Sequence, residues 1–294
     1  MMPKEKKGSK NIFAVVLLAV LFTTISYTKA YAYNPETLEK LKKGVESWNK
    51  FRNDYPSFEI DLRMVNLKGF DLKGINLSKA LLGKADLTDA NLVEANLSNA
   101  ELIAANLEGV NLSRGSVSGA DLTEAKLTKG FFIGTDFRGA TLVRVEMTKA
   151  ILGKANLSQA NLSWANLSDT NLNFAIISNS SLVGTLLKRA DLHGANLSGS
   201  DLRQANLTEV DLRNSDLTKA DLSNANLSFN ENYAGAALWN ANLSFANLIG
   251  SNLYGSDVRG AKFFGAKISK LTILPSGVKG DASWAKEREA LFVE

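Results

Sequence analysis

The chain contains no cysteine, a single histidine and only four prolines among its 294 residues. Without cysteine it has no disulfides, thiolate metal ligands or catalytic thiol, and its redox compartment leaves no mark on the sequence. The one histidine, His193, follows Leu192 on the outward side of its segment and has no second histidine to pair with. We therefore interpret His193 as a surface residue without a catalytic or metal-binding role.

Long hydrophobic runs are scarce too, and the clearest one covers residues 12–25. Four lysines precede this run and Ala30-Tyr31-Ala32 follows it, which predicts a secretory signal peptide over residues 1–32 with cleavage between Ala32 and Tyr33. An uncleaved membrane anchor is the alternative, but the run is shorter than the roughly 20 residues that span a bilayer. We expect export to a periplasm or a thylakoid lumen, with no stable membrane span after cleavage.

An excess of charge of either sign is absent once the predicted signal peptide is removed. The full chain has 34 basic and 30 acidic residues, and residues 1–32 hold five lysines and one glutamate, which leaves 29 of each. Proteins that bind nucleic acid carry a basic stripe or patch. We therefore expect no nucleic-acid partner.

Between residues 60 and 227 an apolar residue recurs every five positions. Of these 34 central positions, 29 are leucine, and the exceptions are also apolar: Val117, Phe132, Phe137, Met147 and Ile177. A step of five residues spreads side chains around a helix and alternates them between the faces of a strand, so the backbone must turn once per pentapeptide. The period predicts an all-β solenoid with the central residues on its axis.

The positions before each central residue fit the same interpretation. Two residues earlier, small residues such as alanine are expected to fill the corner of the coil, and Gly130 is expected to make room for the oversized Phe132. One residue earlier, 23 of the 34 positions are Asp or Asn. In stacked coils these side chains would form columns that hydrogen-bond to each other and to the turns. We assign them a structural role.

The segments that flank the repeats predict caps. Asn34-Pro35 begins a helical pattern, continued by Leu38, Leu41, Val45, Trp48 and Phe51, that predicts a capping α-helix within residues 33–57. A partner-binding helix is the alternative. The repeats extend over residues 58–275, with a one-residue frame break near residues 228–237 and a bulge or short loop expected around Asn230, Glu231 and Asn232. Residues 276–294 are expected to form a C-terminal cap or tail, with a short helix over residues 281–291.

The units ADLTD, ANLVE, ANLSN and ADLSN resemble the pentapeptide-repeat family over about residues 60–273. The resemblance implies a right-handed quadrilateral β-helix with four pentapeptides in each coil. The segment GVESWNKFRNDYP also resembles the capping helix of exported cyanobacterial-type members.

No pattern in the sequence points to catalysis. A nucleophile with a base, paired carboxylates in a cleft, a phosphate-binding glycine loop and the glycine-rich calcium repeat are all missing, so we predict a protein that is not an enzyme and has no cofactor or metal. The outward apolar residues are more informative. With four pentapeptides per coil, one face carries a candidate interaction patch of Phe131, Ile133, Ile151 and Phe174, and the opposite face carries Ile103, Val143, Trp164 and Val183. Packing between stacked strands is the alternative for both sets.

These observations predict an exported structural scaffold or protein-interaction module whose partner is another protein. The oligomeric state stays open, an end-to-end dimer included. A DNA-mimicking topoisomerase inhibitor, as found among the family's cytosolic members, is the first alternative, and export and neutral charge oppose it. A β-helical polysaccharide-active protein is the second, and the short single insertion opposes it because such enzymes carry acidic clusters in long grooves.

Overall fold

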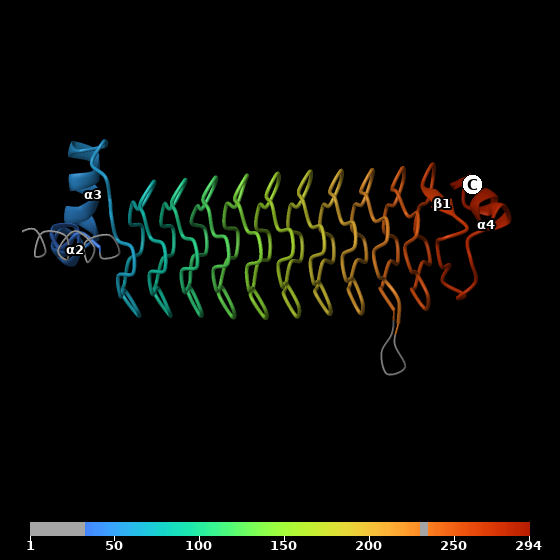
Figure 1. Cartoon of the computed structure of the whole chain (residues 1–294), viewed down its shortest axis with the longest axis horizontal. Helices are drawn as coiled ribbons and strands as arrows, with labels where there is room; N and C mark the ends of the chain where they lie inside the picture. The colour runs from blue at the N-terminus through green and yellow to red at the C-terminus, as the bar shows by residue number, and fades with distance from the viewer. Residues whose placement is uncertain (1–32, 230–234) are drawn as a thin grey trace, which may run out of the picture.

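The computed structural model describes residues 33–229 and 235–294 and shows one elongated stack of coils (Figure 1). The predicted signal peptide with Ala32, and Asn230, Glu231 and Asn232 of the predicted loop, lie outside the described residues. Helices α2 (Pro35–Lys42) and α3 (Val45–Asp54) lie at one end of the stack. Helix α4 (Ala282–Glu287) lies at the other end, with strands β1 (Lys267–Ser269) and β2 (Leu291–Val293).

Each regular coil consists of four pentapeptides and has four sides. Parallel bridges join Asp61 to Leu81, and the next three bridges start at Asn66, Asp71 and Asn76, always with a partner four pentapeptides later. We name the sides first to fourth after these four starting residues. The bridging residues of the third side, on which the candidate sites lie, are Asp71, Asn91, Asn111, Phe131, Ile151, Asn171, Asp191, Asp211, Ala237 and Asp257.

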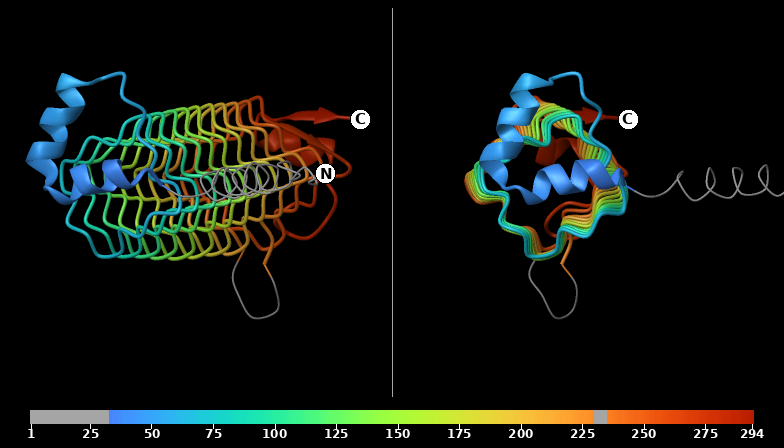
Figure 2. Two further views of the ribbon diagram at one scale, coloured as in Figure 1. Left: turned by 60° about the vertical axis from the view of Figure 1, so that its left-hand side comes forward. Right: turned by 90° about the vertical axis from the view of Figure 1, so that its left-hand side faces the viewer.

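The core is one continuous column along the axis of the stack. All 34 central positions between Leu62 and Leu227 are buried, with side chains at most 2% exposed, which confirms the prediction that they point inward. The end-on view in Figure 2 shows the coils superimposed around one common axis. Burial of each leucine contributes about 1.5–3 kcal/mol, so the spacing of the leucines holds the four-sided section in place.

Every side of a coil ends in a tight turn that the periodicity alone does not reveal. In the unit of Leu82, the Ala85 N–H donates to the Leu82 carbonyl at 3.0 Å, and the Lys84 N–H donates to Ile103 of the next coil at 2.9 Å. Lys84 has a φ of 57°, in the left-handed region that a type II turn requires at this place. Equivalent residues along the chain, glycines and non-glycines alike, share this conformation.

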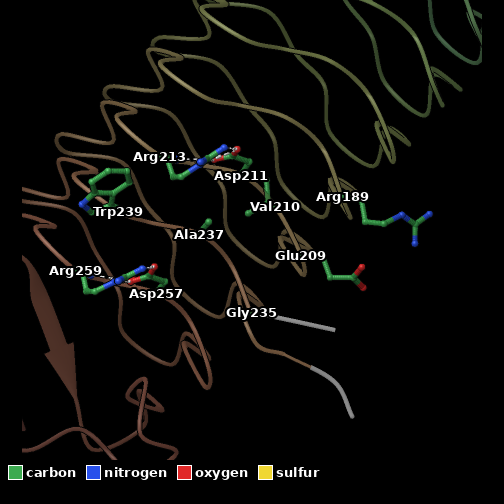
Figure 3. A pocket seen from close by; sticks show the side chains of 10 residues that line it. All are labelled: Arg189, Glu209, Val210, Asp211, Arg213, Gly235, Ala237, Trp239, Asp257 and Arg259. Carbon is green, nitrogen blue, oxygen red and sulfur yellow. Dashed lines mark hydrogen bonds and ion pairs between the residues drawn. The ribbon is translucent and has the colours of Figure 1, made fainter. Parts of the chain in front are cut away.

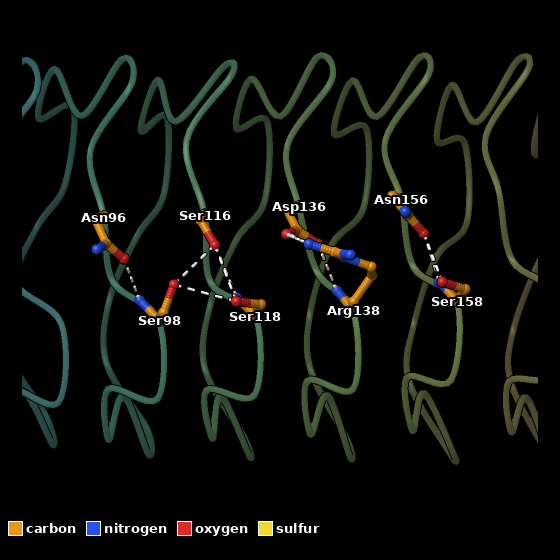
Figure 4. Close-up of polar contacts among 8 residues, drawn as sticks. All are labelled: Asn96, Ser98, Ser116, Ser118, Asp136, Arg138, Asn156 and Ser158. Carbon is orange, nitrogen blue, oxygen red and sulfur yellow. Dashed lines mark hydrogen bonds and ion pairs between the residues drawn. The ribbon is translucent and has the colours of Figure 1, made fainter.

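Side chains of the Asp and Asn columns bind the turns of their own coils (Figure 4). On the fourth side, the Asn96 Oδ1 accepts from the Ser98 N–H at 3.0 Å, and the Asn156 Oδ1 accepts from the Ser158 N–H at 3.1 Å. Bonds between coils also occur, such as the Asn91 Nδ2 to the Asp71 Oδ1 at 2.8 Å. Both predicted roles of these columns are therefore confirmed.

The N-terminal end carries two helices where the sequence predicts one. The helical path is interrupted at Gly44, whose φ is 97°. Glycine adopts this backbone conformation readily because it has no Cβ. The Asn34 side chain caps α2 by accepting from the Glu36 N–H at 2.9 Å. Trp48 of α3 is fully buried, and its Nε1 donates to the Asn76 carbonyl of the first coil at 2.8 Å.

One coil is longer than the others. Asp211 pairs with Ala237, six residues beyond the position that the regular spacing selects, and that spacing returns when Ala237 pairs with Asp257. The ladder of the third side therefore continues across an insertion of six residues. Six residues amount to one pentapeptide plus one, which is why the frame of five shifts by a single residue at this point.

The C-terminal end differs from the predicted helix over residues 281–291. Helix α4 is capped by the Asp281 side chain, which accepts from the Trp284 N–H at 2.8 Å, and it ends at Glu287. Leu291 then enters β2, which pairs in parallel with β1 and adds one strand to the first side. Without β2, the edge of β1 would expose unpaired backbone N–H and C=O groups. Hydrogen bonds to these groups favour a strand over a longer helix at residues 291–293.

Gly130 tests the fixed volume of the core. A Cβ at this position would lie 2.5 Å from the Phe132 Cε2, although the backbone conformation accepts alanine. We expect Gly130→Ala to lower the free energy of unfolding by about 1–3 kcal/mol through overpacking. Adding Phe132→Leu restores the alanine–leucine pair of a regular unit and should recover most of the loss in denaturant melts. Equal stability of the single variant and the parent would contradict this packing.

Asp136 and Arg138 test the contribution of the ion pairs within a coil. The side-chain hydrogen bonds from Arg138, at 2.9 and 2.7 Å, outweigh burial and lower the pKa of Asp136. Because the pKa is lowered in the folded state, the pair stabilises the protein above the ordinary Asp pKa near 3.9, and this stabilisation is lost as the pH falls through the lowered folded value.

Arg138→Gln should raise the pKa of Asp136 in a carbon-detected NMR titration. It should also remove a small pH-dependent stabilisation, because Arg138 is exposed and solvent screens its interaction with Asp136. The matched control is Arg144→Gln, since Arg144 lies 3.8 Å from its partner Glu124. An unchanged pKa of Asp136 in the first variant would show that Arg138 does not hold the carboxylate in solution.

Candidate binding surfaces

Three of the four residues of the predicted interaction patch lie side by side on the third side. Phe131 and Ile151 are bridge partners in adjacent coils, and Ile133 is the first central residue of the turn that follows Phe132 on the same side of the stack. Phe131 and Ile133 are 42% and 46% exposed, and Ile151 is partly buried. We call these three residues the Phe131 patch.

Phe174, the fourth predicted residue, is turned toward the next coil. It sits in a turn with a φ of 55° and is 52% exposed. Its ring packs edge-on against His193 at 5.5 Å between centroids and lies over Gly194, where a Cβ would come within 2.6 Å. Phe174 therefore joins the residues on its C-terminal side, and the Phe131 patch does not include it.

The residues predicted for the opposite face lie on the first side. Ile103 and Trp164 are exposed, whereas Val143 and Val183 are partly buried. The ring of Trp164 lies over Gly184 of the next coil, where a Cβ would approach it to 2.4 Å. A glycine in the turn of the following coil thus makes room for an aromatic ring here, as it does for Phe174.

A second surface on the third side was not predicted from the sequence. It is an open cleft of about 690 Å³ beside the insertion, and Figure 3 shows its lining side chains. We call the part formed by three successive coils the Trp239 cleft, and its residues are Asp211, Arg213, Ala237, Trp239, Asp257 and Arg259. The regular spacing of 20 residues per coil would place Trp239 beside Lys219. The sequence did not reveal the length of the insertion, so it did not predict that Trp239 lies between Arg213 and Arg259.

Two ion pairs flank the cleft. Arg213 holds Asp211 with its Nε at 2.8 Å from Oδ1, and in the coil on the other side Arg259 holds Asp257 with Nε–Oδ1 and Nη2–Oδ2 distances of 2.8 and 2.6 Å. Both pairs follow the same D-x-R pattern, in which the bridging residue binds the side chain two positions later. This pattern is readable in the sequence and could have pointed to the flanks of the site.

These pairs keep both carboxylates ionised. Hydrogen bonds from the Arg259 side chain are the main cause that lowers the pKa of Asp257. Burial acts to raise the pKa of Asp211, but hydrogen bonds from the side chain and backbone of Arg213 outweigh it and the pKa is lowered. At neutral pH the Trp239 cleft therefore presents two fixed carboxylates and two fixed guanidinium groups. Arg189 and Glu209, which line the rest of the same 690 Å³ cleft, add one charge of each sign, so the charges sum to zero.

The coil between the two pairs breaks the D-x-R pattern. Ala237 occupies the place of the aspartate and Trp239 the place of the arginine, with Trp239 47% exposed. In the flanking coils the aspartates also accept the backbone N–H of Arg213 at 3.0 Å and of Arg259 at 3.2 Å. The Ala237 side chain contains no acceptor. Within residues 33–229 and 235–294 no group accepts the backbone N–H of Trp239.

Two further observations concern the whole described part of the chain. There, no three His, Asp or Glu side chains come together in a way that could hold a metal ion. None of α2, α3 and α4, the helices of that part, has the length and hydropathy of a membrane-spanning segment.

Comparison with known proteins identifies the repeat. The family model for pentapeptide repeats matches in eight copies, over residues 60–99, 80–119, 117–153, 155–194, 190–228 and 234–269. Among solved structures, HetL, a pentapeptide repeat protein involved in heterocyst differentiation regulation from Nostoc sp. strain PCC 7120, is 30% identical, with 79% of this chain and 98% of HetL covered and a TM-score of 0.34.

Two other solved structures are more distant. QnrB1, a plasmid-mediated fluoroquinolone resistance protein, is 18% identical, with 69% of this chain and 90% of QnrB1 covered and a TM-score of 0.26. A pentapeptide repeat protein from the Arabidopsis thaliana thylakoid lumen is 22% identical, with 52% and 70% covered and a TM-score of 0.19. Curated protein sequences give no significant match.

Pentapeptide repeat proteins of known structure are right-handed quadrilateral β-helices, and the four-sided coils of four pentapeptides agree with that architecture. The family model covers well over half of the chain. The chain therefore belongs to the pentapeptide repeat family.

Proposed function

We propose that this protein is an exported, non-catalytic scaffold that binds another protein through the Phe131 patch. The observation that carries the proposal is the exposure of Phe131 and Ile133 beside Ile151 on a flat, rigid side of the stack. Contiguous exposed apolar side chains favour burial against a partner. The stacked strands hold them in fixed positions, so little conformational entropy is lost when a partner binds.

The contacts of the polar side chains in residues 33–229 and 235–294 support the non-catalytic part of the proposal. The side-chain oxygens of the Asp and Asn columns are engaged with the turns, as for Asn96 and Ser98. The ring of His193 packs on Phe174, and its Nδ1 is buried without a hydrogen-bond partner in the described part of the chain. A general base must instead be held within reach of a nucleophile or substrate.

Export rests on the pattern of residues 1–32, in which lysines precede a short apolar run and small residues follow. The equal numbers of basic and acidic residues after cleavage at Ala32 support the choice of a protein partner over nucleic acid. They also speak against a DNA-mimicking role, because a DNA mimic requires an excess of acidic charge on its surface.

A triple variant tests the proposed partner site. Phe131→Ser, Ile133→Thr and Ile151→Thr remove the apolar surface. They introduce residues that the repeat already uses at equivalent places, such as the bridging residues Ser116 and Thr141 and the turn residue Thr123. The matched control is Ile176→Thr with Leu186→Thr, since these bridging residues are 41% and 42% exposed on other sides.

The measurement is cross-linking with mass spectrometry on extracts of the native compartment. We expect the triple variant to lose at least one partner that both the parent and the control variant retain. Circular dichroism should show the same fold for all three proteins. An identical set of partners for the triple variant would remove the Phe131 patch from consideration.

We also propose that α2 and α3 cap the first coil. Both helices lie across the end of the stack in the end-on view (Figure 2), and Trp48 is buried between α3 and the coil. An uncapped solenoid exposes the core and the strand edges of its terminal coil.

Trp48→Ala should therefore accelerate amide hydrogen exchange in the first coil, residues 60–80, and leave the C-terminal coils unchanged, because coils are coupled chiefly to their neighbours. Trp284→Ala is the matched control at the other end, where Trp284 packs edge-on against Phe263 at 5.1 Å. It should accelerate exchange near β1 instead. Unchanged exchange in the first coil of Trp48→Ala would argue against a capping role.

A further inference from the structure

We propose that the Trp239 cleft is a binding site for neutral polysaccharide, with one sugar ring resting on the Trp239 indole. The site shares no residue with the Phe131 patch, so each proposal can be tested independently of the other. Figure 3 shows Trp239 and Ala237 between the Asp211–Arg213 pair and the Asp257–Arg259 pair.

The indole supplies the apolar contact. Trp239 is about half exposed on the flat third side, where neighbouring coils lie side by side. Aromatic faces carry partial negative charge and attract the weakly positive C–H groups that one face of a sugar ring presents. The turn that carries Trp239 is hydrogen-bonded to both neighbouring coils, because the Asn214 N–H donates to the Trp239 carbonyl and the Asn240 N–H to the Arg259 carbonyl, both at 3.0 Å. This turn is held in place before the ligand arrives, which lowers the entropic cost of binding.

The ion pairs supply polar contacts on both sides of the indole. They stand on coils two levels apart, which corresponds to about 10 Å at the usual strand spacing. Each guanidinium has five N–H groups, and the bidentate contact between Arg259 and Asp257 uses two side-chain nitrogens. The remaining N–H groups can donate hydrogen bonds to sugar hydroxyls, and the remaining carboxylate lone pairs can accept hydrogen bonds from them.

Ala237 opens the space between the pairs. It is the one alanine among the described bridging residues, and a residue with a longer side chain would fill this place. The small side chain also leaves the backbone N–H of Trp239 without an acceptor in the described part of the chain. A hydroxyl or ring oxygen of a bound sugar could accept from it, which would satisfy a donor that Asp or Asn satisfies in most other coils.

Charge selects the class of ligand. The four charged groups of the cleft cancel in two tight pairs, so neither an anion nor a cation gains a net attraction. Trp and Arg are also common at the centres of protein interfaces. A protein partner's charged groups would compete with pairs that are already formed, whereas hydroxyls can add hydrogen bonds and leave the pairs intact. This favours a neutral polyhydroxyl ligand.

Ala237→Asn is the sharpest test, because binding and stability should respond differently. Asparagine at this place should accept the Trp239 N–H, as Asn96 does for Ser98 at 3.0 Å, and should fill the cleft. We expect this variant to bind saccharide at least tenfold more weakly than the parent while its melting temperature stays the same or rises. Trp239→Ala should weaken binding by about tenfold or more through loss of the aromatic contact.

Trp164→Ala is the matched control for Trp239→Ala. Trp164 is 56% exposed on the first side, where the Asp201–Arg203 pair lies two coils away, and its removal should leave saccharide binding unchanged. Isothermal titration calorimetry with cellohexaose, xylohexaose and mannohexaose provides the neutral probes. Oligogalacturonate provides the anionic one.

Binding of a neutral hexasaccharide that persists at high salt and is lost in Ala237→Asn and Trp239→Ala would support the proposal. Four outcomes would overturn it. The first is that no neutral probe binds the parent protein at millimolar concentration. The second is binding that survives both variants. The third is binding of oligogalacturonate alone that fades with salt, since screening weakens ionic contacts. The fourth is loss of a protein partner from Trp239→Ala without any saccharide binding.

Discussion

The structure depends on the burial of one apolar side chain every five residues inside a coil of fixed section. Because four such residues meet at each level, their combined volume decides which neighbours are allowed. Phe132 is accommodated because Gly130 leaves the corner empty, and a Cβ there would be 2.5 Å from its ring. The leucine column thus sets the shape of the chain, and the outward residues have little influence on it.

Because the core residues set the shape of the coil, outward residues can change and create binding surfaces without altering the fold. The residue before each central position is usually Asp or Asn, and its oxygen binds the turn of the same coil. Replacing it with an apolar residue, as at Phe131 and Ile151, exposes a hydrophobic surface without changing the coil. Replacing it with alanine, as at Ala237, leaves space beside the turn and a backbone N–H of Trp239 that no described residue accepts. The same position therefore yields two different kinds of surface.

The sequence predicted the parts of the fold that follow from local periodicity. A leucine every five residues predicts the inward column, and Gly130 before Phe132 predicts the matched volumes. It did not predict the break at Gly44 or the strand β2, because both depend on contacts with coils far away in the sequence. The left-handed turns were also missed, since residues as different as Lys84 and Trp164 adopt the same positive φ when the stacked coils impose it.

The Trp239 cleft illustrates why a site is harder to predict than the solenoid that carries it. Neighbours on a side are residues of different coils, so their identity depends on the length of every coil between them. The shift of one residue in the frame is compatible with one extra residue or with six, and only the pairing of Asp211 with Ala237 distinguishes these cases. With six, Trp239 falls between Arg213 and Arg259. An insertion that leaves the ladder intact can therefore create a new surface by changing which side chains become neighbours.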